Sequence, residues 1–194
     1  MKKARGRELF DKYKKFISLG TLFYRLFPRD IRIVIMNRNS HKKGKLRMAQ
    51  RYMLLKSLAK NVGNNVSIHD NVFLFHVENL SIGNNVSIHP MCYIQASGGI
   101  EIGNDVSIAH GVTLMTENHS YNEMNMPIKD QPIKKLPIVI EDDVWIGAKA
   151  TILCGKTVKH GSVIGANAVV TKDVAEMNIV AGNPAKIIRL RGKC

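Results

Sequence analysis

A histidine within a polar segment is the residue of this 194-residue chain whose type and surroundings best suit catalysis. His119 lies between Asn118 and Ser120. Imidazole exchanges protons near neutral pH and is the side chain that most often acts as a general base. His119 is therefore a candidate base. Most histidines in surface loops are inert, so the weight of this interpretation depends on the elements that position the residue.

Those elements have a period of six residues. Aliphatic side chains recur at every sixth position of the C-terminal half: Ile140, Ile146, Ile152, Val158, Ile164 and Val170. This period fits neither a helix nor a simple strand. It is typical of a solenoid in which each short strand is one repeat and three repeats make one turn.

The N-terminal half of the repeat region carries the same pattern in longer units. Units of about 20 residues begin at Val62, Ile82 and Ile102, and units of 18 begin at Ile140 and Val158. Glycine and asparagine supply the backbone freedom that the corners need. Stacked coils would bury one continuous aliphatic column. An ordinary β-sandwich with Gly/Asn turns is the alternative, and so long a register disfavours it.

The repeat fails between Leu114 and Ile140, which predicts an extruded loop over about 115–139. Three prolines in this stretch prevent it from continuing a ladder of strands: Pro127, Pro132 and Pro137. A long excursion from a regular scaffold is usually functional. His119 lies in this excursion, and its position there favours the catalytic interpretation.

Composition indicates a reduced, cytoplasmic protein. The chain is 45% hydrophobic, and no apolar run reaches the ~18 residues expected of a membrane span. No signal peptide is evident. The three cysteines, Cys92, Cys154 and Cys194, show neither metal-ligand spacing nor even pairing.

The net charge of +14 is concentrated in the first 60 residues, which hold 18 Lys/Arg against three acids. Apolar residues recur there at helical spacing between lysines and arginines. We expect basic amphipathic helices over residues 1–60, which either cap the solenoid or contact an anionic membrane surface. The two roles are compatible. Nucleic acid binding is disfavoured, because no groove-reading motif accompanies the charge.

Four motifs together resemble the hexapeptide-repeat acyltransferases. They are Asn118-His119, residues 140–148 (IEDDVWIGA), residues 163–173 (VIGANAVVTKD) and residues 180–186 (VAGNPAK). The resemblance is strongest to the branch of galactoside, maltose and streptogramin acetyltransferases and surface-polysaccharide O-acetyltransferases. It implies a mainly β chain that forms a left-handed parallel β-helix over residues 61–175. A tail over 176–194 would end in a short C-terminal helix.

The resemblance also implies a homotrimer with active sites between subunits, acetyl-CoA as acyl donor and no metal. His119 would be the catalytic base. The residues that match the family's donor site are Trp145, Gly147, Ala148, Ala166, Thr171, Lys172, Lys186 and Arg189. The candidate acceptor-site residues are weaker: His89, Ser97 and Asn118. The expected reaction is O-acetylation of a cell-surface polysaccharide or its precursor, performed in the cytoplasm or at the inner face of the plasma membrane.

Three alternatives stay open at this point. The acceptor could be an antibiotic or the amino group of a nucleotide-sugar. A γ-type carbonic anhydrase would need three zinc-binding histidines between subunits, for which His89, His110 and His119 are candidates. A non-catalytic assembly subunit would leave both His119 and the donor motifs unexplained.

Overall fold

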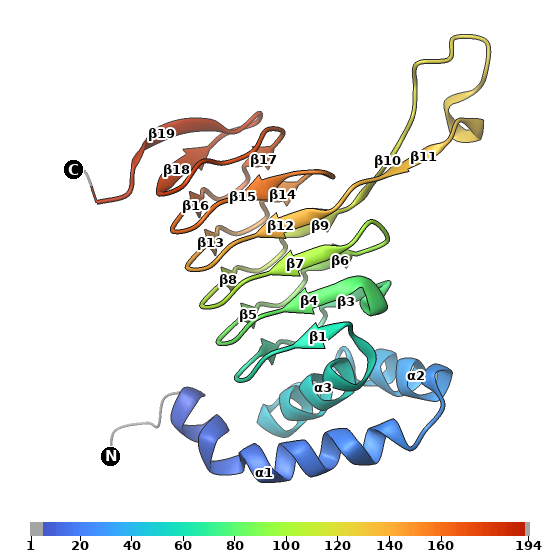
Figure 1. The fold of residues 1–194 in the computed structure, drawn as a ribbon, viewed down its shortest axis with the longest axis vertical. Coiled ribbons are helices and arrows are strands. Elements are labelled where there is room, and N and C mark those ends of the chain that lie inside the picture. Colours follow the sequence, from blue (N-terminus) through green and yellow to red (C-terminus); the bar gives the residue numbers. More distant parts are fainter. Residues whose placement is uncertain (1–5, 193–194) are drawn as a thin grey trace.

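A computed structural model describes residues 6–192 as one β-solenoid with three helices at its N-terminal end (Figure 1). Residues 1–5 and 193–194, and with them Cys194, lie outside the described residues. The helices are α1 (Gly6–Arg25), α2 (Arg29–Asn39) and α3 (Lys45–Leu58). Pro28 separates α1 from α2, since a proline disfavours helical geometry in the residue before it.

The helices cap the first coil of the solenoid. Leu54 and Leu55 of α3 are fully buried, and α3 packs on the first strands. The Tyr52 hydroxyl donates to the carbonyl of Gly63 at 2.7 Å. The buried guanidinium of Arg51 donates to the carbonyl of Ile68 at 2.9 Å. These bonds join the helical layer to the solenoid backbone.

The coils form three parallel sheets. Sheet A contains β1 (Asn61–Val62), β4 (Leu80–Ile82), β7 (Ile100–Ile102), β12 (Ile138–Ile140) and β15 (Thr157–Val158). Sheet B contains β2 (Ser67–Ile68), β5 (Ser87–Ile88), β8 (Ser107–Ile108), β13 (Trp145–Ile146), β16 (Val163–Ile164), β18 (Asn178–Ala181) and β19 (Lys186–Leu190). Sheet C contains β3 (Phe73–Phe75), β6 (Tyr93–Gln95), β9 (Thr113–Met115), β14 (Thr151–Ile152) and β17 (Val169–Val170). Two 3₁₀ turns occupy Val77–Asn79 and Ile128–Asp130.

The predicted mainly β fold, a left-handed parallel β-helix, is confirmed. Each coil visits sheets A, B and C in turn, and equivalent residues stack in register, as in Ile82↔Ile102↔Ile140. The aliphatic residues of the six-residue period are all buried, with 1% or less of their surface exposed. At the corner between sheets A and B, Asn64 and Asn84 each donate a backbone N–H to the side-chain oxygen of the residue one coil on, Asn84 and Asn104.

The predicted C-terminal helix is wrong within the described residues. Lys186–Leu190 forms strand β19, which pairs antiparallel with β18. β18 is the last parallel strand of sheet B, and its free edge offers unpaired backbone groups that a returning strand satisfies. The β-branched pair Ile187 and Ile188 also suits a strand.

The interruption of the repeat is a long hairpin. Its base is the antiparallel pair β10 (Glu117–His119) and β11 (Ile133–Lys135). Figure 1 shows this hairpin projecting from the solenoid at the end of sheet C. None of the helices within residues 6–192 is long and apolar enough to cross a bilayer.

Candidate active site

His119 lies at the base of the projecting hairpin. It is the last residue of β10 and pairs with Ile133 of β11. The side chains of Asn118 and His119 are both exposed in the single chain. The imidazole is thus available to a ligand, and the antiparallel ladder holds the backbone on either side of it.

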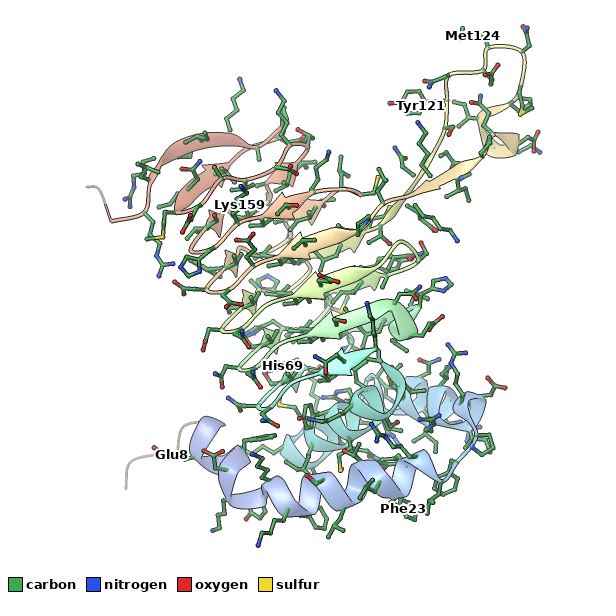
Figure 2. The ribbon with its side chains drawn as sticks, in the orientation of Figure 1. Glu8, Phe23, His69, Tyr121, Met124 and Lys159 are labelled. Atoms are coloured by element: carbon green, nitrogen blue, oxygen red, sulfur yellow. The ribbon has the colours of Figure 1, made fainter. Side chains whose placement is uncertain are left out.

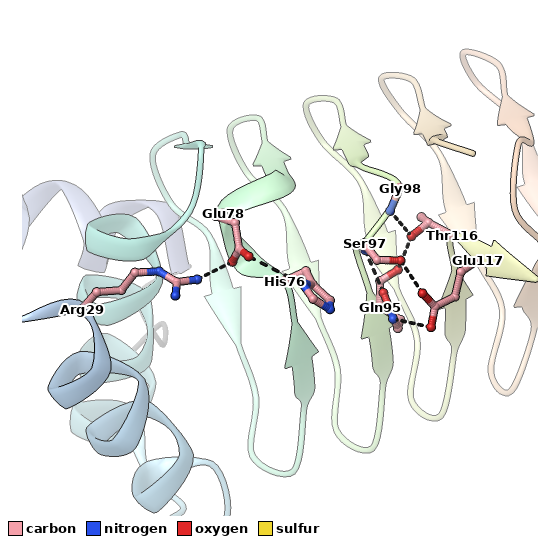
Figure 3. Close-up of polar contacts among 8 residues, drawn as sticks. All are labelled: Arg29, His76, Glu78, Gln95, Ser97, Gly98, Thr116 and Glu117. Carbon is pink, nitrogen blue, oxygen red and sulfur yellow. Dashed lines mark hydrogen bonds and ion pairs between the residues drawn. The ribbon is translucent and has the colours of Figure 1, made fainter. Parts of the chain in front are cut away.

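Thr116 fastens the start of the hairpin to the preceding coil. Its hydroxyl donates to the carbonyl of Gln95 at 2.7 Å and accepts the N–H of Gly98 at 2.8 Å (Figure 3). The N–H of Leu136, on the returning arm, donates to the Thr116 carbonyl at 2.9 Å. Both arms of the hairpin therefore meet at one fully buried residue.

Glu117 continues this attachment with its side chain. Its carboxylate accepts a hydrogen bond from the Gln95 amide at 2.7 Å and another from the Ser97 hydroxyl at 2.7 Å (Figure 3). The side-chain amide oxygen of Gln95 in turn accepts the backbone N–H of Ser97 at 2.7 Å. Hydrogen bonds to an ionised carboxylate are stronger than neutral ones, so the network firmly braces the strand that carries His119.

The donor-site candidates of residues 140–166 lie on another face. Trp145 is on β13 of sheet B, with 56% of its surface exposed. Gly147, Ala148 and Ala166 follow β13 and β16 at the corner between sheets B and C. A Cβ at Gly147 would lie 2.6 Å from the backbone nitrogen of Ala166. The coils approach so closely here that only glycine fits at the buried position 147, whereas Ala148 is half-buried and Ala166 is exposed.

The remaining donor candidates divide between two places. Thr171 and Lys172 follow β17 at the corner between sheets C and A. This is the corner from which the hairpin leaves, two coils nearer the C-terminus. Lys186 and Arg189 lie on β19 at the edge of sheet B, and both side chains are exposed. All three cations therefore lie on the C-terminal part of the solenoid.

The acceptor-site candidates are not brought together in one chain. Ser97 lies beneath the hairpin, where its hydroxyl is bound to Glu117. His89 lies at the corner between sheets B and C and stacks on His69, with ring centroids 4.7 Å apart and planes 11° from parallel. Burial, and then the charge of His89, lower the pKa of His69 below its ordinary value.

Within a single chain, the candidate base His119 does not lie beside Trp145 of the donor-site candidates. His119 projects from the corner of sheets C and A, whereas Trp145 lies on sheet B. Figure 1 shows β10 and β13 on opposite sides of the solenoid. Within the described ranges, no three His, Cys, Asp or Glu side chains gather as metal ligands would.

Sequence reasoning missed the residues that brace the hairpin: Gln95, Thr116 and Glu117. One signal was present. Gln95 stacks between Phe75 and Met115 in sheet C, and a buried amide between two apolar side chains needs a specific hydrogen-bonding partner.

Comparison with known proteins supports the repeat and the fold. A family model described as a hexapeptide repeat of succinyl-transferase matches residues 137–172. A chloramphenicol acetyltransferase of Agrobacterium fabrum is 60% identical over 53 residues, which are 27% of this chain and 25% of that protein. The chain spans about a quarter of the length of the curated relatives that it matches.

Solved structures agree over a larger part of the chain. A hexapeptide-repeat acetyltransferase of Vibrio cholerae, in complex with acetyl-CoA, has a TM-score of 0.76 and 28% identity, covering 85% of this chain and 87% of that one. A maltose O-acetyltransferase of Clostridium difficile has a TM-score of 0.76 and 26% identity, with coverages of 85% and 87%. The chain therefore carries the hexapeptide repeat over residues 137–172, and over most of its length its fold is similar to that of hexapeptide-repeat acetyltransferases.

Proposed function

We propose that this protein is an acetyltransferase that moves the acetyl group of acetyl-CoA to a sugar hydroxyl of a cell-surface polysaccharide or its precursor. One observation carries the proposal: His119 is exposed on a braced hairpin of a fold whose solved neighbour binds acetyl-CoA. The maltose O-acetyltransferase neighbour supports a sugar hydroxyl as the acceptor group.

The donor would lie along the small-residue surface. The small side chains of Ala148 and Ala166 would let a linear pantetheine arm approach the backbone, Gly147 would let the two coils pack closely beneath it, and Trp145 flanks this surface on sheet B. Thr171, Lys172, Lys186 and Arg189 would contact the nucleotide end, because cations suit its phosphates. No metal is needed for this chemistry.

His119 would act as general base in a direct transfer. Its imidazole takes the proton of the acceptor hydroxyl while that oxygen attacks the thioester carbonyl. The tetrahedral intermediate collapses, the C–S bond breaks, and the imidazolium returns the proton to the CoA thiolate. Backbone N–H groups lining the groove would stabilise the oxyanion. Asn118, exposed beside His119, is the acceptor-site candidate nearest the reacting group.

The separation of His119 from Trp145 within one chain supports a homotrimer. In it, the hairpin of one subunit would face the donor surface of the next. His89, at the corner near that donor surface, would then contact the acceptor across the interface, whereas Ser97 would act through Glu117. We place this assembly in the cytoplasm, peripheral at the inner face of the plasma membrane.

Release of CoA from acetyl-CoA in the presence of candidate glycans tests the reaction. The product should lose its acetyl group in mild alkali, as an ester does. Mixing two inactive variants tests the shared site. His119→Ala removes the base, and Ala166→Trp places a bulky side chain on the exposed donor surface. Dissociated and reassembled together, the two should regain activity at mixed interfaces. Failure of every mixture would contradict a site built from two subunits.

A second candidate acceptor is a small antibiotic. The local 60% identity to a chloramphenicol acetyltransferase favours it, although that likeness covers only 53 residues. The same assay with chloramphenicol separates the two acceptors. An alkali-stable product would instead indicate an amide, and hence an amino-sugar acceptor.

A further inference from the structure

We propose that the outer face of α1 docks on an anionic lipid bilayer, with the helix lying in the headgroup region and the solenoid standing above it. Docking does not depend on acetyl transfer.

Two opposite faces of α1 are apolar. The inner face packs on α3 through Phe10, Ile17 and Tyr24. The outer face carries side chains that are each more than half exposed, over the last part of the helix and the residue after it: Phe16, Leu19, Leu22, Phe23 and Leu26. At 100° per residue, Leu19 lies directly opposite Ile17 and Thr21. Several neighbouring large apolar side chains exposed on one face mark a contact surface, so this outer face needs a covering partner.

Cations flank the apolar face. Lys15 and Lys12 lie on the same side as Leu19 by helical spacing, one and two turns toward the N-terminus. Arg25 lies at the other end of the helix. Lysine and arginine can place their alkyl stems along hydrocarbon and keep their charges among headgroups. Apolar residues with basic neighbours are the composition of helices that lie in a membrane interface.

The position of α1 leaves this face free for a flat surface. Figure 1 shows α1 lying across the N-terminal end of the solenoid as the outermost layer. Figure 2 shows Phe23 on the side of α1 that faces away from the solenoid. Nothing in residues 6–192 folds beneath it, so a bilayer could contact the whole length of the helix.

The charge of the N-terminal segment favours a bilayer over a second copy of the chain as the partner of the outer face of α1. Residues 1–60 carry 18 Lys/Arg and three acids. Pairing two such segments face to face would bring like charges together at short range, which opposes association. An anionic membrane attracts each of them, by about 1 kcal/mol per cation near the surface.

Docking in this orientation fixes the distance between the membrane surface and the base of the hairpin. The hairpin leaves the third coil, above two layers of helix, so its base would lie roughly 30 Å from the headgroups, given the usual spacings of strands and helices. A long glycan chain could reach His119 there, whereas a sugar attached directly to lipid could not. This consequence rests on the proposed function.

Vesicle co-flotation of the purified full chain tests the docking. We expect the protein to float with phosphatidylcholine vesicles that contain phosphatidylglycerol as about a third of the lipid, and not with phosphatidylcholine alone. Raising the salt concentration should weaken the binding. The double variant Leu19→Ser/Phe23→Ser should bind roughly tenfold or more weakly, because both apolar side chains leave the interface. Lys12→Gln/Lys15→Gln should lose part of the preference for anionic lipid.

Met124→Ser is the matched control, since Met124 is 92% exposed on the distant hairpin. It should float like the wild-type chain. Folding of each variant is checked by circular dichroism and acetyl-CoA binding, which also keeps a failure of docking distinct from a failure of the acetyltransferase proposal. Equal flotation of wild type and Leu19→Ser/Phe23→Ser would overturn the inference. So would assembly of wild-type protein beyond a trimer that this variant abolishes, because a second copy would then cover the face.

Discussion

Glu117 and His119 lie two positions apart on β10, so their side chains project from the same face of that strand. Glu117 is bound by Gln95 and Ser97 of the preceding coil, and His119 extends beyond it toward solvent. The carboxylate thus fixes the direction in which β10 leaves the solenoid, and with it the direction of the imidazole. Glu117 is a positioning residue in this account.

Glu117→Gln should loosen the base of the hairpin. One carboxylate oxygen becomes an amide NH₂ that faces a donor, which costs about 1–3 kcal/mol locally. Faster amide hydrogen exchange over residues 117–135 would report this, while the exchange of coil residues stays unchanged. Glu123→Gln is the control, because Glu123 bonds to Gln131 of the hairpin through its backbone N–H and carbonyl, which the substitution keeps. Equal exchange in both variants would contradict the bracing role.

His119→Ala should lower turnover by about 10²–10⁴-fold, the usual contribution of general base catalysis. Binding of acetyl-CoA should persist, because the donor candidates lie on other parts of the solenoid. Thiol detection of released CoA measures the first quantity and calorimetry the second. His41→Ala, an exposed histidine of the N-terminal segment, should leave turnover unchanged. Full activity of His119→Ala would show that another group is the base.

The stacked pair His69 and His89 should make the first coils sensitive to acid. Burial, followed by the neighbouring His89, lowers the pKa of His69 from 6.5, so the folded state binds this proton less readily than the unfolded state. The free energy of unfolding is therefore at its full value above pH 6.5, and it decreases as the pH falls from 6.5 through the lowered pKa of His69 in the folded state. NMR titration should show His69 protonating below 6.5, and His89→Ala should raise its pKa. Titration of His69 above 6.5 in the folded wild type would contradict the stacked environment.

Gly83→Ala should destabilise the solenoid. A Cβ there would lie 2.6 Å from the carbonyl oxygen of Gly103. Relieving this clash would require the backbone of the next coil to move, which costs more free energy than a side-chain rotation. We expect a cost of about 1–3 kcal/mol, as for overpacked cores, and a fall in melting temperature of several degrees. Ser81→Ala, on β4 of the same coil, is the control. A melting temperature equal to that of the control would mean that the coils are not stacked this closely.

The fold was predictable because its signal is periodic. Each aliphatic residue from Ile140 to Val170 occupies the same place in successive strands, so one observation repeats along the chain. The C-terminal helix was mispredicted because the free edge of β18 selects a strand, and an edge is a property of the assembled sheet rather than of the local sequence.

The candidate site was predictable only in part. His119 stood out because it interrupts a repeat. The bracing by Gln95 and Glu117 joins residues 22 apart, and no local pattern links them. Likewise, the spacing of His89 and Ser97 placed both near an acceptor, yet the coil sends them to different corners.

Calorimetric titration of the folded protein with acetyl-CoA tests whether this solenoid binds the acyl donor. We expect saturable binding at one site per chain, retained in His119→Ala and abolished in Ala166→Trp, whose new side chain would occupy the exposed donor surface. Absence of binding to the folded wild-type assembly would contradict the assignment of this solenoid as an acetyl-CoA-dependent transferase.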